Sequence, residues 1–325
     1  MAYEKVSEEE RIYLYKIRVK WTLDMKIRHF LKVVNNFIDT FPDSDIVASF
    51  SGGADSLVML DILRKNINPN FPAVFADTGV EFPEIRKFVK LFKNVDIIKP
   101  VVPYKGVLDT YGYPIISKMT ARRIRDLRKP VGVNEKTKSL ILTGVTSTGR
   151  LAPSFKIANK WLYLVNAPFK ISEQCCDALK KNPLNAYAKE KDVLYIIGTM
   201  ASESLMRKKN YFKYGCNIFT EGNSKCRPLS IFTSEDIWEY IRGENLKYCE
   251  VYDCGYRHTG CISCGFGCHL EKGENRYQKL YKSHPKLWNY HIDNLGWGKV
   301  LDYIGIPYVP RPCLFDKNQY KNKSK

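Results

Sequence analysis

The sequence has no hydrophobic run long enough to cross a membrane. Its longest strongly apolar stretches, residues 140–142 and 194–197, are far shorter than the ~20 residues that a membrane helix needs. Residues 1–11 are rich in Glu and Lys and contain no apolar segment of the kind found in secretory signals. We therefore expect a cytoplasmic protein with no membrane partner.

The expected cytoplasmic location also determines which oxidation state we expect for the ten cysteines. In the reducing cytoplasm thiols stay free, so disulfides are not expected. Cysteines that cluster in the sequence then indicate metal ligands or reactive thiols.

Acidic residues are also scarce. The chain has 34 Asp and Glu against 52 Lys and Arg, which gives a formal net charge of +18 and a pI near 9.3. Such a balance favours polyanionic partners, nucleic acid first, although a soluble enzyme from a lysine-rich proteome is the alternative. Hydrophobic residues make up 44% of the chain, which excludes an intrinsically disordered protein.

Helical and strand patterns alternate through the middle of the chain. Short apolar runs predict strands, and the segments between them predict helices. We expect strands at residues 45–50, 73–76, 95–98, 139–143 and 193–197, and helices at residues 31–41, 57–64 and 83–92. The expected fold class is therefore α/β, a mostly parallel twisted sheet with helices on both faces.

The chain divides by character into three segments. Residues 1–42 form an expected helical segment, which opens with a capping pattern at Ser7 and Glu10. Residues 43–220 hold the α/β pattern. Residues 221–325 contain seven of the ten cysteines and few strand signals, and they end in a basic tail.

A glycine loop joins the first expected strand to the following helix. It contains Ser51, Gly52, Gly53, Asp55 and Ser56. The glycines let the backbone turn tightly, and the start of the helix directs free N–H groups at an anion. The hydroxyls add donors, and the carboxylate suits a Mg²⁺ ion that bridges phosphate oxygens. The loop therefore predicts a phosphate site, but not a Walker site, because no Gly-Lys-Ser/Thr follows.

This loop resembles the PP-loop of the ATP pyrophosphatases, which cleave ATP between its α- and β-phosphates and usually adenylylate a substrate oxygen. Two further elements make the chain similar to the phosphoadenylyl sulfate (PAPS) reductase family over residues 46–268. Asp77 and Thr78 stand in a block that resembles the family's second strand, close to the nucleotide. Residues 198–204 with Arg207 resemble its Gly-x-Arg-x-x-Glu-Ser-x-x-Arg element.

The resemblance implies roles for single residues. Asp55 and Arg207 are the expected catalytic residues, the arginine by stabilising developing phosphate charge. Met200 stands where the family carries its first arginine, which puts one contact to the ligand in doubt. ATP and Mg²⁺ are the expected small-molecule cofactors. The implied nucleotide-binding residues are Ser51, Gly52, Gly53, Asp55, Ser56, Asp77, Thr78, Gly198 and Glu203.

Four cysteines form two close pairs. Cys175 and Cys176 are adjacent, and 84 residues separate them from Cys261 and Cys264, which form a C-x-x-C pair. The C-x-x-C spacing directs two thiolates at one metal site. The residues alone leave a tetrahedral zinc ion, a [4Fe–4S] cluster and free thiols as alternatives.

The resemblance favours the [4Fe–4S] cluster. This arrangement of cysteines is similar to the ligand pattern of the family's iron–sulfur branch, which contains adenylyl sulfate reductases and the ATPases of DNA phosphorothioation. Cys268 is a candidate sulfur carrier, because the imidazole of neighbouring His269 can lower the pKa of its thiol. Cys313 lacks the Glu, Gly and His that surround the family's reductase nucleophile.

A basic stripe precedes the first cysteine pair. Lys118, Arg122, Arg125 and Lys129 are spaced four, three and four residues apart, so they share one face if residues 118–129 are helical. Such a stripe suits a phosphate backbone. A solvated helix face is the alternative, and the resemblance also allows Lys118 to face the nucleotide.

These features predict an ATP-dependent iron–sulfur enzyme that transfers sulfur to nucleic acid, similar to DNA phosphorothioation enzymes. DNA is the first expected acceptor and tRNA the second, with a cysteine desulfurase as the sulfur donor. The alternative is a PAPS or adenylyl sulfate reductase of sulfate assimilation, which would need Cys313 or Cys268 as nucleophile. A non-catalytic nucleotide-binding module is the second alternative.

Overall fold

The computed structural model describes residues 6–220, 222 and 224–310. The chain forms two compact units, and each is built from two separate stretches of sequence. The first comprises Met1–Val101 and Leu179–Thr259, and the second comprises Val102–Ala178 and Gly260–Lys325. These units divide the chain at other points than the three segments expected from sequence character, because strands far apart in the sequence pair in one sheet.

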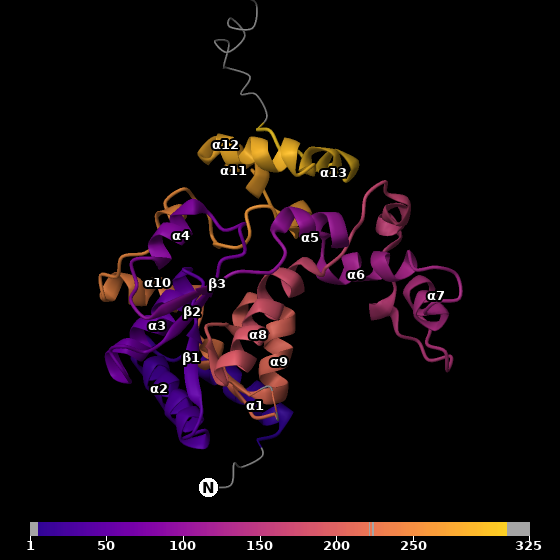
Figure 1. The fold of residues 1–325 in the computed structure, drawn as a ribbon. Coiled ribbons are helices and arrows are strands. Elements are labelled where there is room, and N and C mark those ends of the chain that lie inside the picture. Colours follow the sequence, from indigo (N-terminus) through magenta and orange to yellow (C-terminus); the bar gives the residue numbers. More distant parts are fainter. Residues whose placement is uncertain (1–5, 221, 223, 311–325) are drawn as a thin grey trace, which may run out of the picture. The chain divides into compact units, whose positions relative to one another are not determined.

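A six-stranded sheet forms the centre of the first unit (Figure 1). Its order is β3-β2-β1-β5-β7-β6, and every pair is parallel except the antiparallel pair of β6 and β7. The strands are β1 Asp45–Ser49, β2 Ala73–Ala76, β3 Val95–Ile98, β5 Val193–Ile197, β6 Asn217–Ile218 and β7 Lys225–Cys226. The mostly parallel sheet predicted from the sequence is confirmed.

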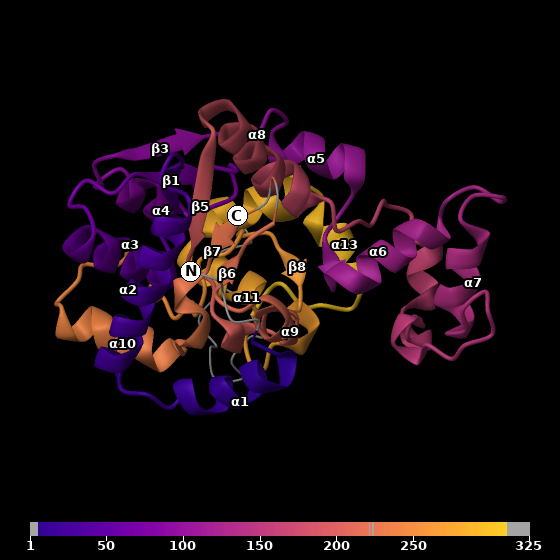
Figure 2. The same ribbon diagram turned by 90° about the horizontal axis from the view of Figure 1, so that it is seen from below.

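Helices cover both faces of this sheet. α8 packs Leu184 and Tyr187 on a core of Val47, Val74 and Val193 from three strands. α2, α3 and α10 pack together on the other side of the strands (Figure 2). The helices of this unit are α1 Glu8–Arg18, α2 Leu23–Thr40, α3 Ala54–Asn66, α4 Pro83–Val89, α8 Asn182–Lys191, α9 Leu205–Tyr214 and α10 Ser234–Gly243.

The N-terminal helices belong to this unit. The side chain of Ser7 accepts a hydrogen bond from the Glu10 N–H at 3.1 Å and caps α1, as the sequence predicted. α2 begins earlier than the expected residue 31, because Thr22 caps a helix that starts at Leu23. Lys26 of α2 is 2% exposed, and its Nζ lies 2.5 Å from Oδ2 of Asp236 in α10. This buried ion pair joins the N-terminal helix α2 to α10, which belongs to the second stretch of sequence in this unit.

The second unit is mainly helical. Its two short strands, β4 and β8, pair in parallel. No helix in the described part of either unit is long and apolar enough to span a membrane. The elements of this unit are α5 Tyr104–Tyr111, β4 Ile115–Ile116, α6 Lys118–Leu127, α7 Glu135–Thr143, the 3₁₀ segment η2 Asn159–Asn166, β8 Gly265–Phe266, α11 Arg276–Ser283, α12 Pro285–Asn289 and α13 Trp297–Tyr303.

One expected strand is wrong. Residues 139–143 form the second half of helix α7 and pair with no strand. The apolar run at residues 140–142 is too short for its periodicity to separate a strand from a buried helical turn. The polar residues before it decide the outcome, because Glu135 and Lys138 pair one turn apart at 2.9 Å and support a helix.

Candidate functional site

The glycine loop lies where β1 ends and α3 begins. Gly52 has a φ of +71°, and a Cβ atom there would lie 2.9 Å from Cγ2 of Val89, so a side chain does not fit. Gly53 is the N-cap of α3, and no side chain of its own satisfies the first N–H groups. Because β1, β2 and β5 are parallel neighbours, their carboxyl ends share this edge of the sheet. The start of a helix at that edge suits a phosphate group.

Ser56 holds the loop in shape. Its Oγ donates to the carbonyl of Gly53 at 3.0 Å, accepts from the Ser51 N–H at 3.1 Å, and lies 3.0 Å from the Ser51 Oγ. Ser56 is buried, whereas Ser51 is exposed. The buried Ser56 therefore fixes the turn, and the exposed Ser51 presents its hydroxyl at the surface of the loop.

The structure brings the two expected catalytic side chains together. Asp55 is half-buried in the first turn of α3; burial raises its pKa, and interactions with His258 and Arg207 act in the opposite direction. Arg207 of α9 forms an ion pair with Glu203, whose carboxylate also accepts the Met200 N–H at 2.8 Å. Glu203 thus positions the arginine, whose positive charge acts on the loop's carboxylate.

The residues expected after β2 and β5 also lie at this edge. Nη2 of Arg86 is 2.9 Å from Oδ1 of Asp77. Thr78 is buried, and its N–H and hydroxyl donate to Glu81 at 3.0 and 2.7 Å. A Cβ atom on Gly198 would lie 3.3 Å from the Cα of Ser56, so the end of β5 touches the start of α3. The hydroxyl of Thr78 therefore stabilises its own turn through its hydrogen bond to Glu81, while Asp77 lies at the sheet edge.

Two residues that the sequence analysis missed contact the loop directly. The hydroxyl of Tyr252 accepts a hydrogen bond from the Ala54 N–H at 2.8 Å and also bonds to Thr259. The Thr259 hydroxyl lies 2.6 Å from the position that a Cβ on Gly53 would take. The chain has 21 tyrosines, and no sequence pattern distinguishes the one that reaches the loop.

The four paired cysteines all lie in the second unit and interact with one another. The hydrogen bond with Cys176, then burial, and then the charges of Cys264 and Cys261 raise the pKa of the Cys175 thiol. Among the described residues, no three His, Cys, Asp or Glu side chains surround a single metal position as they stand. The two cysteine pairs, far apart in the sequence, nevertheless form one group of thiols.

Buried side chains fix the C-x-x-C turn. Ser263, inside it, is fully buried and its Oγ bonds to Nδ1 of His291. Its carbonyl accepts from the hydroxyl of Tyr277 at 3.3 Å, and Nη1 of Arg276 donates to the carbonyl of Cys264 at 2.7 Å.

The cations near Cys264, one of the four thiols, suit an anionic metal–thiolate group. Burial raises the pKa of Cys264, while the Phe266 N–H and the charges of Arg276 and Lys118 act to lower it. These groups favour the thiolate form that binds iron or zinc. Lys118, the first residue of the basic stripe, therefore lies close to the thiols.

The expected activation of Cys268 by His269 is not found. Burial, with Glu271 nearby, raises the pKa of Cys268 to about 12, so the thiol stays protonated at neutral pH. The ring of His269 packs edge-on against Trp161, with 5.2 Å between the ring centres. Adjacent residues here point to different surroundings. Cys226 and Cys249 are buried, and Cys313 lies outside the described residues.

Most of the basic stripe lies on helix α6, and its charge is partly neutralised. Arg122 and Arg125 of α6, with Lys129 just after its end, lie around the buried carboxylate of Asp126, at 3.9, 3.8 and 2.8 Å. Arg125 also pairs with Glu173 at 3.1 Å. These side chains therefore stabilise α6 and its contact with the segment before the first cysteine pair.

Comparisons with known proteins agree with these elements. An adenosine 5′-phosphosulfate reductase of Oceanobacillus iheyensis is 26% identical over 68% of this chain and 71% of its own length. Two uncharacterized proteins of Methanocaldococcus jannaschii are 25% and 24% identical over 75% and 88% of this chain, which spans 40% and 56% of their lengths. A solved PAPS reductase from Candida auris in its phosphate complex has a TM-score of 0.43 and 18% identity, covering 80% of this chain and 98% of its own.

The family match covers both the loop and the four paired cysteines. The model of the phosphoadenosine phosphosulfate reductase domain matches residues 45–104 and 153–265, which is more than half of the chain. The chain therefore belongs to the phosphoadenosine phosphosulfate reductase family.

Proposed function

We propose that this protein uses ATP to activate an oxygen of a nucleic acid and then replaces that oxygen with sulfur. The observation that carries the proposal is the glycine loop, where the start of α3, an exposed serine hydroxyl and the Asp55 carboxylate, within range of the Arg207 charge, lie at one edge of the sheet. The net charge of +18 supports a polyanionic acceptor. DNA is the first proposed acceptor and tRNA the second.

Activation takes place at the α-phosphorus of ATP. The acceptor oxygen attacks that phosphorus, the bond to the bridging oxygen of the β-phosphate breaks, and pyrophosphate leaves. The N–H groups at the start of α3 and the hydroxyl of Ser51 bind phosphate oxygens. Asp55 would hold a Mg²⁺ ion against them, and Arg207 stabilises the negative charge that grows at phosphorus.

Sulfur then replaces the activated oxygen. A sulfur nucleophile, supplied by a cysteine desulfurase, attacks the adenylylated centre, and AMP leaves with the original acceptor oxygen. Cys175, Cys176, Cys261 and Cys264 would hold a [4Fe–4S] cluster, which when bound can take up sulfur or transfer electrons. The donor set fits this group, because four interacting thiols stand near Arg276 and Lys118.

A nucleotide turnover assay tests the proposal. Anaerobically purified protein receives ATP, adenylyl sulfate or PAPS, each with and without DNA or tRNA, and pyrophosphate, AMP and sulfite are measured. We expect pyrophosphate from ATP, with stimulation by a nucleic acid. Sulfite from a sulfonucleotide, with no pyrophosphate from ATP, would contradict the proposal.

The second candidate is sulfonucleotide reduction. The observation in its favour is the similarity to adenosine 5′-phosphosulfate reductases, exemplified by that of Oceanobacillus iheyensis. In that reaction a thiolate attacks the sulfate sulfur, and AMP leaves. Cys268, the candidate nucleophile within the described residues, does not fit a ready thiolate, since burial raises the pKa of its thiol to about 12. The same assay separates the two candidates through the product.

A further inference from the structure

Positive charge is concentrated in one part of the second unit. Residues 118–170 contain 12 Lys and Arg against 2 Asp and Glu, a net charge of +10 out of +18 for the whole chain. The stretch contains α6, α7 and η2. Most of it, residues 118–152, lies between the two stretches that match the family domain. This charge is therefore largely a feature of the chain's own sequence and not of the shared domain.

Several of these cations already serve the fold. Arg128 donates to four backbone carbonyls of residues 164–169 at 2.6 to 2.9 Å. Arg123 donates to the carbonyls of Ser154 and Lys156, and Lys138 pairs with Glu135 at 2.9 Å. With the pairs around Asp126, these contacts hold the layer together, so they are not its ligand-binding groups.

Four other cations remain open to a partner. Lys136, Arg150, Lys156 and Lys160 are all exposed. Across residues 6–220, 222 and 224–310, no acidic side chain lies within ion-pair distance of any of them. Backbone hydrogen bonds join their segments, since the N–H of Ile157 donates to Ile141 in α7 at 2.8 Å. They therefore project from one connected layer of the unit.

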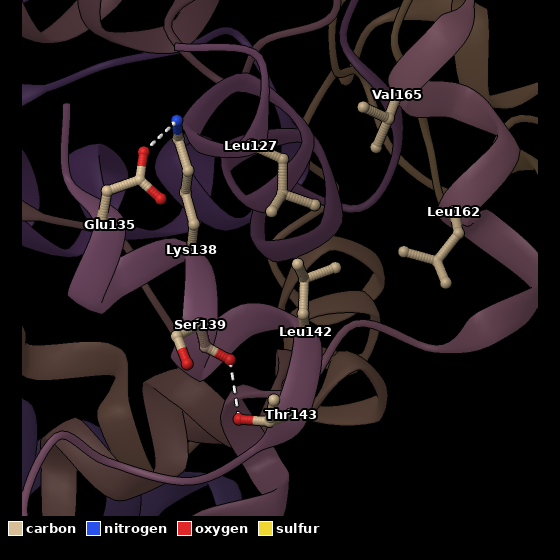
Figure 3. Close-up of a pocket in the computed structure, with 8 residues that line it drawn as sticks. All are labelled: Leu127, Glu135, Lys138, Ser139, Leu142, Thr143, Leu162 and Val165. Carbon is tan, nitrogen blue, oxygen red and sulfur yellow. Dashed lines mark hydrogen bonds and ion pairs between the residues drawn. The ribbon is translucent and has the colours of Figure 1, made fainter. Parts of the chain in front are cut away.

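Exposed apolar groups accompany these charges. Phe155 is 54% exposed and Leu151 is 77% exposed, while Nζ of Lys160 lies 5.1 Å from the ring centre of Trp161. Beside α7 is a hollow of about 570 Å³, lined in equal number by polar residues and by apolar ones, which include Leu127, Leu142 and Leu162. Figure 3 shows these leucines around the hollow and Lys138 turned toward Glu135. A solvated basic face would not need such apolar exposure, whereas nucleic-acid bases stack on aromatic groups.

We propose that residues 118–170 form the surface that binds the nucleic acid, with Lys136, Arg150, Lys156 and Lys160 on its phosphates and Phe155 against a base. This inference rests on the proposed function for its choice of partner and adds the place of binding. It replaces the stripe of Lys118, Arg122, Arg125 and Lys129 as the main phosphate contact, because that stripe is partly neutralised by Asp126 and Glu173.

Direct binding by the full chain tests the surface. The probes are a single-stranded DNA of about 20 nucleotides, its duplex, and a folded tRNA, titrated at about 50, 100 and 200 mM salt. In the test variant Lys136, Arg150, Lys156 and Lys160 are each changed to Gln. In the control variant the exposed residues Lys87, Lys90, Lys189 and Lys191 of the first unit are changed to Gln, which removes the same charge.

We expect the test variant to bind at least tenfold more weakly at about 100 mM salt, with the salt slope reduced by about three. The affinity of the control variant should fall by less than about threefold, because its changes remove only charge that lies far from the proposed surface residues in the sequence. Phe155→Ala should weaken binding of the single strand by about tenfold with little change in the salt slope. All variants should keep the melting temperature of the parent, since the changed side chains are exposed.

The outcomes separate the surface from the reaction. Equal weakening in the test and control variants, or no binding by the parent at about 50 mM salt, would overturn the inference. Preference for a soluble polyglutamate over every nucleic acid would overturn it in favour of an acidic protein. Binding that depends on these four residues, in a protein that cleaves no ATP, would support the surface and contradict the proposed function instead.

Discussion

The hydroxyl of Tyr252 accepts a hydrogen bond from the Ala54 N–H, the first amide of α3, at 2.8 Å. A phosphate oxygen bound at this helix start would seek the same N–H. Tyr252 therefore takes up the donor that a bound phosphate would need, and a phosphate at this loop would have to share or displace that contact.

The first prediction concerns this contact. In Tyr252→Phe the hydroxyl is lost, so a phosphate no longer competes with it for the Ala54 amide. We expect ATP to bind about three- to tenfold more tightly, which corresponds to one ordinary hydrogen bond. Isothermal titration calorimetry measures the change. Weaker binding in the variant would instead identify the hydroxyl as a direct nucleotide ligand.

The second prediction concerns the loop's carboxylate. Asp55→Ala should lower nucleotide turnover by at least about a hundredfold, because Mg²⁺ and the Arg207 charge lose their counterpart. The fold should be kept, since the Asp55 side chain makes no hydrogen bond or ion pair within the described part of the chain. Asp43→Asn, an exposed change on the surface, is the control. Normal turnover in Asp55→Ala would exclude the loop as the reaction site.

The third prediction concerns the four thiols. Protein purified without oxygen should contain iron and absorb near ~400 nm, and Cys176→Ala should lose both signals. Cys254→Ser, which changes an exposed cysteine outside the group, should keep them. An unchanged iron content and spectrum in Cys176→Ala would remove this residue from the ligand set.

The fourth prediction concerns the buried ion pair of the first unit. Lys26→Met leaves the carboxylate of Asp236 buried without its partner, so we expect the free energy of unfolding to fall by about 3–5 kcal/mol. Lys20→Met, at an exposed position, should change it by less than about 0.5 kcal/mol. Denaturant unfolding measures both. Equal stability of the two variants would show that Asp236 does not need the lysine.

The fifth prediction concerns pH. Burial, with Arg18 and Lys32 nearby, lowers the pKa of His29 to about 4. The unfolded chain, with a pKa near ~6.5, takes up this proton first, so stability is complete above that value and is lost as the pH falls toward about 4. Between about pH 7 and pH 5 the loss from this residue is about 2 kcal/mol. Unfolding of His29→Gln should show a shallower pH dependence by that amount, and an identical dependence would contradict it.

Much of the first unit could be predicted from the sequence. β2, β3 and β5 match their expected ranges, and the loop lies between a strand and a helix, because buried parallel strands are short continuous apolar runs. α7 could not be predicted, because its apolar half looks like a strand when the polar half is ignored. The two units alternate along the chain because β1 pairs with β5, which lies far from it in the sequence. Local sequence patterns do not predict such long-range pairing.

The candidate site shows the same division. The residue types of the loop predict a phosphate site, and those of the cysteine pairs predict a metal site. The structure brings the residues of each set together. Tyr252 and Thr259 were missed because their role depends on distance in space, and neither has a distinctive neighbour in the sequence. The expected influence of His269 on Cys268 failed for the converse reason, since neighbours along the chain face different surroundings.

The alternation of the two units along the chain has a consequence for biosynthesis. β1, β2 and β3 leave the ribosome early, but β5 and β7 follow only after residues 102–178 have been made. During that interval one edge of β1 has no strand beside it, which invites wrong pairing. The interval is longer for Cys175 and Cys176, because the other two thiols of their group, Cys261 and Cys264, are translated only after Thr259, the last residue of the first unit. A metal bound by all four thiols would therefore be acquired late, after all segments of the first unit have been translated.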